Sequence, residues 1–212
     1  MRVIDLTHTI TQDMPVFPGT DQPSIRGYAT VPTDGFRECM ITLDSHTGTH
    51  MDSSAHAIAD GDTLDLLPAE QFLGKAAIVD CRDVAPGDEI GLEHVEDLGS
   101  VAEEADFLVF RTGWGERWDT DGYFGGYPLL SDELIDALVA GGWKGIGLDA
   151  PSVDSIDAMT KHRRLLGIRN IVIVENLCNL GSCPEGLFWL GCFPLRYAGA
   201  DGSPVRALAW EE

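Results

Sequence analysis

Three of the six histidines in this 212-residue chain lie in one short segment, HTGTHMDSSAH, which spans residues 46–56. His46, His50 and His56 share this segment with the carboxylate of Asp52. Imidazole nitrogens and carboxylate oxygens are the groups with which proteins bind zinc and similar divalent cations. Random placement seldom gathers such a set in so short a stretch. The segment is therefore interpreted as part of a metal site.

The spacing within the segment favours a loop. His46 and His50 are four residues apart, as in helical zinc sites, but the intervening Thr-Gly-Thr forms helix poorly. Gly48 permits a tight bend that would bring two imidazoles together. The alternative is a polar turn whose histidines only hydrogen-bond to nearby backbone. That alternative is favoured for any single histidine, but not for the whole set.

The elements before this segment are extended. Residues 25–31 and 37–43 have the composition of strands, and the second leads directly into the histidine-rich segment. Further upstream, MPVFPG at residues 14–19 contains two prolines and a glycine, which predict an ordered but irregular loop. The candidate ligands are therefore expected just after a strand.

The rest of the chain alternates strands and helices. A helix is predicted at residues 131–140, with Ser131 as its N-cap, and a second at about residues 92–98. Residues 188–197 and 205–210 flank a turn and predict a strand pair. Short apolar runs that end near polar residues predict strands buried on both faces at residues 76–80, 106–110, 145–149 and 171–175.

Composition limits the partners and the location. The 14 Lys and Arg against 35 Asp and Glu give a net charge of -21, which would repel nucleic acid and anionic membranes. No apolar stretch approaches the roughly 20 residues that cross a bilayer, and the start lacks a signal-peptide pattern. Five cysteines without CxxC spacing predict reduced thiols and, with the missing signal, a cytoplasmic protein. Because no repeat or linker interrupts residues 1–212, a single mixed α/β domain is expected.

The motifs resemble one enzyme family. HTGTHMDSSAH is similar to the HxGTHxDxPxH signature of the cyclase-like metal-dependent hydrolases, which include bacterial kynurenine formamidase and isatin hydrolase. DLTHTI and MPVFPGT resemble the opening strand and loop of this family. RTGW, GIGLDAPSVD and HRRLLGIRNIVIVENL resemble its later blocks, in the same order. The resemblance implies a swivelling β/β/α-type domain with a mixed sheet that forms homodimers or homotetramers.

The resemblance also implies a two-metal site. His46, His50 and Asp52 would bind one ion, while Asp52 and Glu175 would bridge to a second ion that His162 also binds. Glu175 ends a buried apolar run, where an unpaired carboxylate costs several kcal/mol and a cation would neutralise it. His162 taken alone is more typical of an exposed helical residue. Mixed imidazole and carboxylate ligands favour Zn²⁺, with Mn²⁺ as the alternative.

The implied chemistry is hydrolysis. His56 matches the family's proton-transfer residue, and a neutral imidazole with a pKa near 6.5 suits that role. Metal ions can activate water and polarise a carbonyl, so no protein nucleophile is needed, and the chain has no GxSxG motif. The family usually has proline at the position of Ser54, so this loop lacks a fixed φ angle and its rigidity is in question.

The expected substrate is a small amide. Phe17 matches an aromatic residue that contacts substrate in the formamidase branch, although that branch more often has tryptophan. Its alternative is a hydrophobic plug beneath the loop. Trp114, Trp118 and Tyr123 are interpreted as core residues. The leading prediction is an arylformamidase acting on an N-formylkynurenine-type substrate. The alternatives are a cyclic amide or lactone hydrolase and a non-catalytic metal-binding protein of the same fold.

Overall fold

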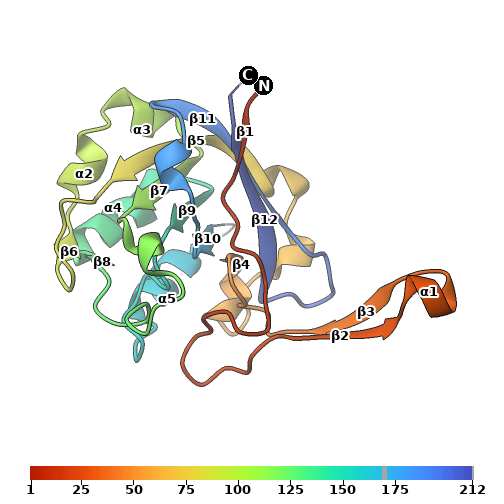
Figure 1. Cartoon of the computed structure of the whole chain (residues 1–212). Helices are drawn as coiled ribbons and strands as arrows, with labels where there is room; N and C mark the ends of the chain where they lie inside the picture. Colours follow the sequence, from red (N-terminus) through yellow and green to blue (C-terminus); the bar gives the residue numbers. More distant parts are fainter. Residues whose placement is uncertain (169–170, 212) are drawn as a thin grey trace.

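A closed mixed sheet forms the centre of the molecule. The computed structural model describes residues 1–168 and 171–211 (Figure 1). The eight strands follow the order β1-β12-β11-β5-β7-β9-β10-β4, and a further pairing of β12 with β4 closes the sheet into a barrel-like arrangement. The strands in this order are β1 (Val3–Asp5), β12 (Gly202–Trp210), β11 (Leu187–Pro194), β5 (Leu73–Asp80), β7 (Phe107–Arg111), β9 (Gly145–Leu148), β10 (Val172–Glu175) and β4 (His50–Asp52).

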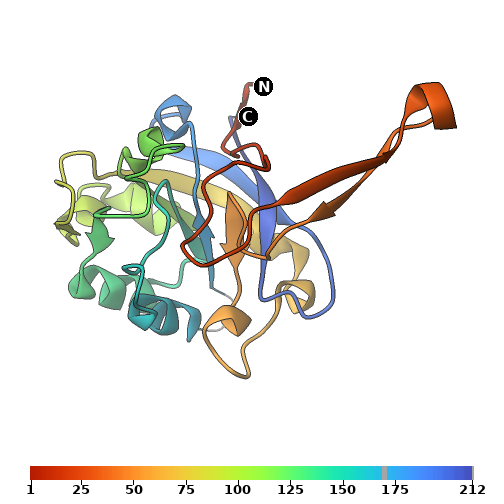
Figure 2. The ribbon, with the colours of Figure 1, turned by 60° about the horizontal axis from the view of Figure 1, so that its bottom comes forward.

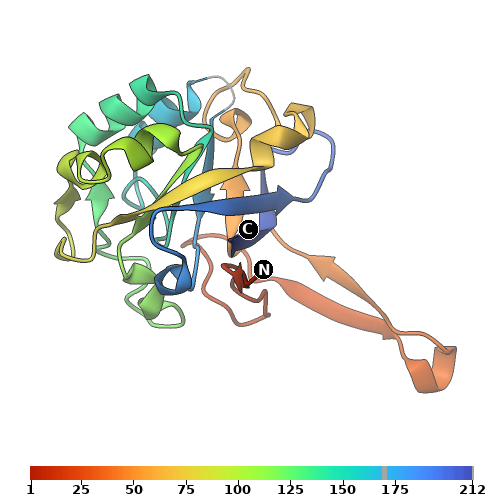
Figure 3. The same cartoon turned by 90° about the horizontal axis from the view of Figure 1, so that it is seen from above.

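The four apolar runs form the parallel part of this sheet. β5, β7, β9 and β10 are neighbours and run parallel, as their continuous apolar sequences predict. The helices and the smaller strand pair complete the fold, and the helices gather on one side of the sheet (Figure 3). These elements are α2 (Glu93–Glu96), α3 (Ser100–Glu104), α4 (Asp132–Gly141), α5 (Thr160–Leu166), β6 (Glu89–Ile90) and β8 (Leu129–Leu130). The 3₁₀ helices are η1 (Ser54–His56), η2 (Leu64–Leu66), η3 (Ala69–Phe72), η4 (Trp114–Arg117) and η5 (Leu180–Ser182).

Two hydrophobic cores result from this arrangement. One lies between the helices and the parallel strands, where Leu134, Ile135 and Leu138 of α4 are buried. The other lies inside the barrel, where side chains alternate along each strand. On β12, Val205 and Ala207 are buried inside, whereas Arg206 between them is exposed. The barrel interior thus fixes the register of β12 against its neighbours.

A two-stranded arm, residues 21–44, extends away from the barrel (Figures 1 and 2). It consists of β2 (Ser24–Ala29), α1 (Val31–Asp34) and β3 (Glu38–Thr42). β2 and β3 pair with each other in a separate sheet. Every residue from 31 to 42 is exposed.

The structure confirms most predicted elements and corrects some. The predicted helix at 131–140 is α4, and the Ser131 side chain accepts a hydrogen bond from the Leu134 amide at 3.1 Å, as an N-cap does. The helix expected at about 92–98 is present as α2, which is shorter at Glu93–Glu96, and a second short helix that was not predicted, α3, follows it. No helix in the described ranges is long and apolar enough to span a membrane.

The loop expected around His50 was also wrong in part, since His50–Asp52 form β4. This three-residue strand pairs with β10 on one side and with β12 on the other. Its conformation therefore depends on strands more than a hundred residues away, which local propensity does not report.

Candidate metal centre

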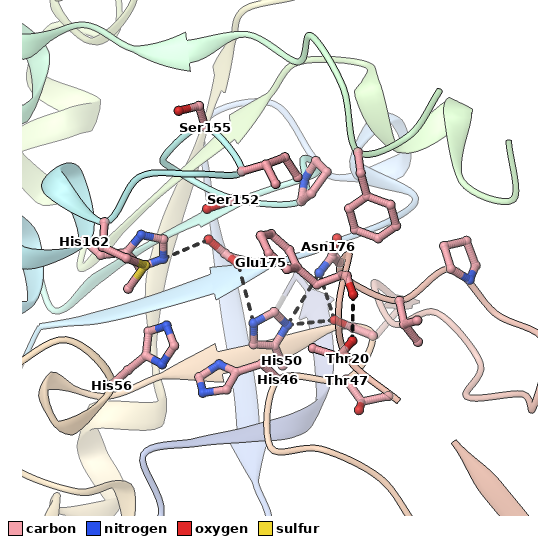
Figure 4. A pocket seen from close by; sticks show the side chains of 18 of the residues that line it. Thr20, His46, Thr47, His50, His56, Ser152, Ser155, His162, Glu175 and Asn176 are labelled. Atoms are coloured by element: carbon pink, nitrogen blue, oxygen red, sulfur yellow. Dashed lines mark hydrogen bonds and ion pairs between the residues drawn. The ribbon is translucent and has the colours of Figure 1, made fainter. Parts of the chain in front are cut away.

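The β4 strand places the histidine-rich segment beside the end of β10. Glu175 is paired with His50, and Ile173 with Asp52. Because side chains alternate along a strand, His50 and Asp52 share one face, while Met51 points to the other and is fully buried in the barrel core. The predicted ligands from two distant parts of the chain thus meet at one edge of the barrel (Figure 4).

One cluster of three side chains joins these two strands. His50 Nε2 lies 3.3 Å from Asp52 Oδ1 and 3.4 Å from Glu175 Oε2. One possible ligand atom from each of the three residues lies within 4.8 Å of the other two. All three side chains are buried. This geometry suits a single cation held between the two strands.

A second cluster shares the Asp52 carboxylate. His46 Nδ1 is 2.7 Å from Asp52 Oδ1, and His46, Asp52 and His56 again offer ligand atoms within 4.8 Å of one another. The rings of His46 and His56 have centroids 4.0 Å apart. The turn of η1, which directly follows β4, brings His56 back towards the strand.

His162 reaches the same centre from α5. Its Nε2 lies 3.5 Å from Asp52 Oδ2 and 3.3 Å from Glu175 Oε1. The side chain is buried, so the exposed position expected for this residue alone was wrong. The structure therefore brings together all six polar residues singled out from the sequence, namely His46, His50, Asp52, His56, His162 and Glu175.

In two of these histidines, the ring nitrogen that points away from the cluster also has a hydrogen-bond partner. His46 Nε2 hydrogen-bonds to Asp201 Oδ2 at 3.0 Å, and His50 Nδ1 to the Gly48 carbonyl oxygen at 2.8 Å. A partner on one nitrogen fixes the tautomer and directs the other nitrogen into the centre. Neither partner was predicted. Asp201 lies in a turn far away in sequence, and the Gly48 partner is a backbone group that residue types do not reveal.

Asp154 holds His162 in the same way. Its Oδ2 accepts hydrogen bonds from His162 Nδ1 and from the His162 amide, both at 2.9 Å, and its Oδ1 accepts one from the Lys161 amide at 3.0 Å. The carboxylate therefore fixes both the start of α5 and the orientation of the His162 ring. Asp154 lies within the block GIGLDAPSVD, which was singled out from the sequence without assigning this residue a role.

The buried carboxylates require positive charge. Burial opposes ionisation of Asp52, but His162, His46 and His50 hold its pKa well below its usual value. Burial would lower the pKa of His46, yet hydrogen bonds to Asp52 and Asp201 raise it to about 9. Burial likewise opposes protonation of His162, but Asp154, Asp52 and Glu175 raise its pKa to about 12.

One buried oxygen in this centre lacks a hydrogen bond. Among the described residues, no donor reaches Asp52 Oδ2 with hydrogen-bonding geometry. An unsatisfied buried carboxylate oxygen is costly, and coordination of a cation is one way to satisfy it. The donor set, its burial and this free oxygen together fit divalent metal ions.

His56 differs from the other three histidines. Burial lowers its pKa, so the imidazole is neutral near pH 7. In the part of the chain that the structure describes, neither of its ring nitrogens is hydrogen-bonded. A neutral ring with free nitrogens can accept and return a proton, or it can bind a metal ion.

A cavity of about 450 Å³ opens onto these residues. Its outer wall contains Phe17, Trp118 and Phe124. The rings of Phe17 and Phe124 meet edge to face with centroids 6.0 Å apart, and Trp118 stacks on His8 with centroids 3.9 Å apart. Phe17 therefore lines the cavity. Trp118 was interpreted as a core residue, but its ring also lines the cavity.

Two aromatic residues of the same region are core residues, as expected. Trp114 is buried, and its Nε1 donates a hydrogen bond to the Tyr123 carbonyl oxygen at 2.7 Å. The Tyr123 hydroxyl donates to Asn176 Oδ1 at 2.7 Å, and Asn176 Nδ2 donates to the Gly48 carbonyl oxygen at 3.0 Å. This chain of bonds holds the carbonyl that fixes the His50 ring.

Sequence and structure comparisons place the chain in a family. Residues 4–155 match the model of the Cyclase family, and the chain belongs to this family. It is 32% identical over 212 residues to the kynurenine formamidase of Salinibacter ruber (strain DSM 13855 / M31), covering 98% of this chain and 97% of the relative.

Two solved structures share the fold. Isatin hydrolase A from Labrenzia aggregata, bound to benzyl benzoate, superposes with a TM-score of 0.87 at 26% identity, over 98% of this chain and 93% of that one. A protein described as a potential metal-dependent hydrolase with cyclase activity gives a TM-score of 0.82 at 26% identity, over 100% and 98% of the two chains. The chain is therefore one of the cyclase-family hydrolases, and the expected mixed α/β fold is confirmed.

Proposed function

We propose that this protein is a metal-dependent amidohydrolase whose leading substrate is an aryl formamide of the N-formylkynurenine type. The observation that carries this proposal is the pair of clusters that share Asp52 at the floor of an aromatic cavity. The 32% identity to a kynurenine formamidase supports the substrate class. The intracellular location proposed with it is the cytoplasm, supported by five free cysteines.

The proposed ligands are His46, His50, Asp52, His162 and Glu175, for two divalent ions with Zn²⁺ favoured and Mn²⁺ as the alternative. Bound divalent cations would lower the pKa of a water molecule and polarise the amide carbonyl.

The remaining side chains would position the substrate and move the proton. Phe17 and Trp118 would pack against an aryl ring, which directs the amide towards the floor of the cavity. His56 would take a proton from the attacking water and return it to the leaving nitrogen. Its free ring nitrogens and its position beside both clusters support this role.

A second candidate is hydrolysis of an uncharged cyclic amide or lactone. Among the described residues, no Lys or Arg lines the cavity, so no such side chain pairs with a substrate carboxylate there. The structural similarity to isatin hydrolase A also supports this second candidate. An uncharged ring would need only the aromatic wall for binding.

A substrate panel with metal analysis tests both candidates. The protein is purified without added metal, analysed for Zn and Mn, and assayed on N-formylkynurenine, isatin and a simple lactone. About two equivalents of metal with fastest turnover of N-formylkynurenine would support the leading proposal. Faster turnover of isatin or the lactone would select the second candidate. Absence of turnover on the whole panel with both metals would refute both and favour a metal-binding protein without catalysis.

A further inference from the structure

Asn176 lies next to His50 and has no assigned role in the proposed chemistry (Figure 4). It follows Glu175 directly at the end of β10, and it is buried and lines the cavity. Its backbone has a φ angle of 58°. This left-handed conformation is uncommon for residues other than glycine and is tolerated best by asparagine and aspartate. Residues held in such conformations cluster at functional sites.

The side-chain amide of Asn176 has a defined orientation. Its Nδ2 donates a hydrogen bond to the Gly48 carbonyl oxygen at 3.0 Å, and its Oδ1 accepts one from the Tyr123 hydroxyl at 2.7 Å. Rotation of the amide by half a turn would place Oδ1 against the Gly48 oxygen, so that two acceptors would face each other without a proton between them. Burial raises the pKa of the Tyr123 phenol well above its usual value, so this hydroxyl keeps its proton and remains a donor. The two contacts therefore fix which end of the amide faces Gly48.

The Gly48 carbonyl benefits from this second contact. Gly48 has a φ of 65°, and a Cβ there would lie 3.0 Å from Met14 Cε, which together favour glycine at this turn. The missing side chain also leaves the peptide group after Gly48 freer to rotate than one after another residue type. The bond from Asn176 opposes that rotation, and the Thr49 hydroxyl ties the two segments together by donating to the Asn176 carbonyl oxygen at 2.6 Å. Asn176 thus holds the carbonyl where the His50 ring can donate to it.

The position of this carbonyl decides the tautomer of His50. His50 Nδ1 lies 2.8 Å from the Gly48 oxygen, and because a carbonyl can only accept, Nδ1 must carry the proton. His50 Nε2 then presents its lone pair towards Asp52 and Glu175, as a metal ligand requires. The Asn176 amide also lies 3.5 Å from Nδ1, which is too long to compete with its 3.0 Å bond to the carbonyl.

We propose that Asn176 is a positioning residue of the metal centre, which holds the Gly48 carbonyl and thereby keeps the proton of His50 on Nδ1. Its Oδ1 is occupied by the Tyr123 hydroxyl, so the amide acts through His50 and not as a ligand. Tyr123 packs edge to face against Trp118, with centroids 5.0 Å apart, so the aromatic wall of the cavity supports the same group of bonds. This inference rests on the proposed function in taking His50 as a metal ligand.

Asn176→Gly and Asn179→Gly form a matched pair of variants. Both residues have a left-handed backbone, with φ angles of 58° and 57°, so glycine fits either position without strain. Asn179 also donates its side-chain amide to a backbone carbonyl, that of Asp5 at 2.8 Å, but it contacts none of the proposed ligands. Each variant loses one amide donor from a turn, and only Asn176→Gly loses the bond to the Gly48 carbonyl.

Each variant is measured in two ways. Competition with a chromophoric chelator should give a Zn²⁺ dissociation constant about tenfold higher for Asn176→Gly, at the lower end of the effect of losing an outer partner of a metal-binding histidine, and an unchanged one for Asn179→Gly. Long-range ¹H–¹⁵N spectra of the metal-free protein are recorded at a pH where the His50 ring is neutral. They should show the proton on Nδ1 in the native chain and in Asn179→Gly, and a mixture of both tautomers in Asn176→Gly. Circular dichroism verifies folding.

Tyr123→Phe is a milder second variant, because it removes only the hydroxyl that fixes the amide. It should shift both readouts in the same direction as Asn176→Gly, but by less, and native values of both would remove Tyr123 from the proposal. A native His50 with its proton on Nε2, or native affinity and tautomer in Asn176→Gly, would overturn the role of Asn176. An equal loss of affinity in Asn176→Gly and Asn179→Gly would assign the effect to the turn and would also overturn it. A native chain that binds no Zn²⁺ would instead refute the proposed function, while the nitrogen spectra still decide the tautomer.

Discussion

Substitution of Asp154 by asparagine should weaken metal binding without a change in any proposed ligand. The carboxylate accepts three hydrogen bonds, two from His162 and one from the Lys161 amide. An amide side chain has one oxygen, so its NH₂ group must face at least one of these donors. If the NH₂ group faces His162, the ring loses its carboxylate acceptor. In the native chain that acceptor keeps a proton on Nδ1 and so leaves Nε2 free for a metal ion.

The expected loss of metal affinity follows from the energy of the hydrogen bond between Asp154 and the His162 ring. A hydrogen bond to a charged group contributes about 1.5–3 kcal/mol, which corresponds to a roughly 10- to 100-fold change in an equilibrium constant. Loss of a carboxylate partner behind a metal-binding histidine typically has the same effect on metal affinity. We therefore expect the dissociation constant of the Asp154→Asn variant to rise by about 10- to 100-fold. Competition with a chromophoric chelator measures it, and the metal content after dialysis verifies it.

Asp149→Asn is the matched control. Asp149 is also buried, at the end of the adjacent strand β9, and accepts three hydrogen bonds, two from Thr112 and one from the Gly113 amide. It contacts none of the proposed ligands, so this variant should lose stability to denaturant with metal affinity within about twofold of the native value. Native affinity in Asp154→Asn, or an equal loss in both variants, would refute the positioning role of Asp154.

Three further substitutions test other parts of the site. His56→Ala should lower kcat by about 10²–10⁴-fold with unchanged metal content, measured by kinetics and elemental analysis of one sample; loss of metal would instead make His56 a ligand. Phe17→Ala should raise KM for an aryl amide roughly fivefold, since aromatic contacts contribute about 1 kcal/mol, and leave KM for formamide unchanged; equal effects on both would contradict stacking. Ser54→Pro should stabilise the protein by about 0.4–1 kcal/mol in urea unfolding, because among the described residues the Ser54 amide donates no hydrogen bond; a lower midpoint would show that proline does not fit the turn.

The sequence predicted the parts of the site that depend on local patterns. Glu175 was assigned through the family resemblance, and the apolar run that ends there predicted a buried carboxylate, which the structure places at the end of β10. The cluster of histidines in residues 46–56 was identified from the sequence alone. The start of α4 was predicted to within one residue, since Ser131 and the apolar stripe mark it.

The parts that depend on distant contacts were not predictable. β4 is extended because β10 and β12 pair with it, although its three residues carry no strand signal. Asp154 and Asp201 act on histidines through hydrogen bonds that no motif encodes. The strands of the arm were identified, but alternation does not show whether the apolar side of a strand faces its own barrel or another surface.

The closure of the barrel by β4 has a consequence for biosynthesis. Asp52 emerges from the ribosome well before its partner, because its strand pairs with Gly202, which lies 150 residues further along the chain. A nascent chain therefore displays unpaired imidazoles and carboxylates until β12 has been made, and it cannot enclose an ion between these strands before then. Contacts between such remote segments also form slowly. Delivery of metal to this protein should accordingly follow the synthesis of β12, and truncations that remove β12 should abolish metal retention even though every proposed ligand remains.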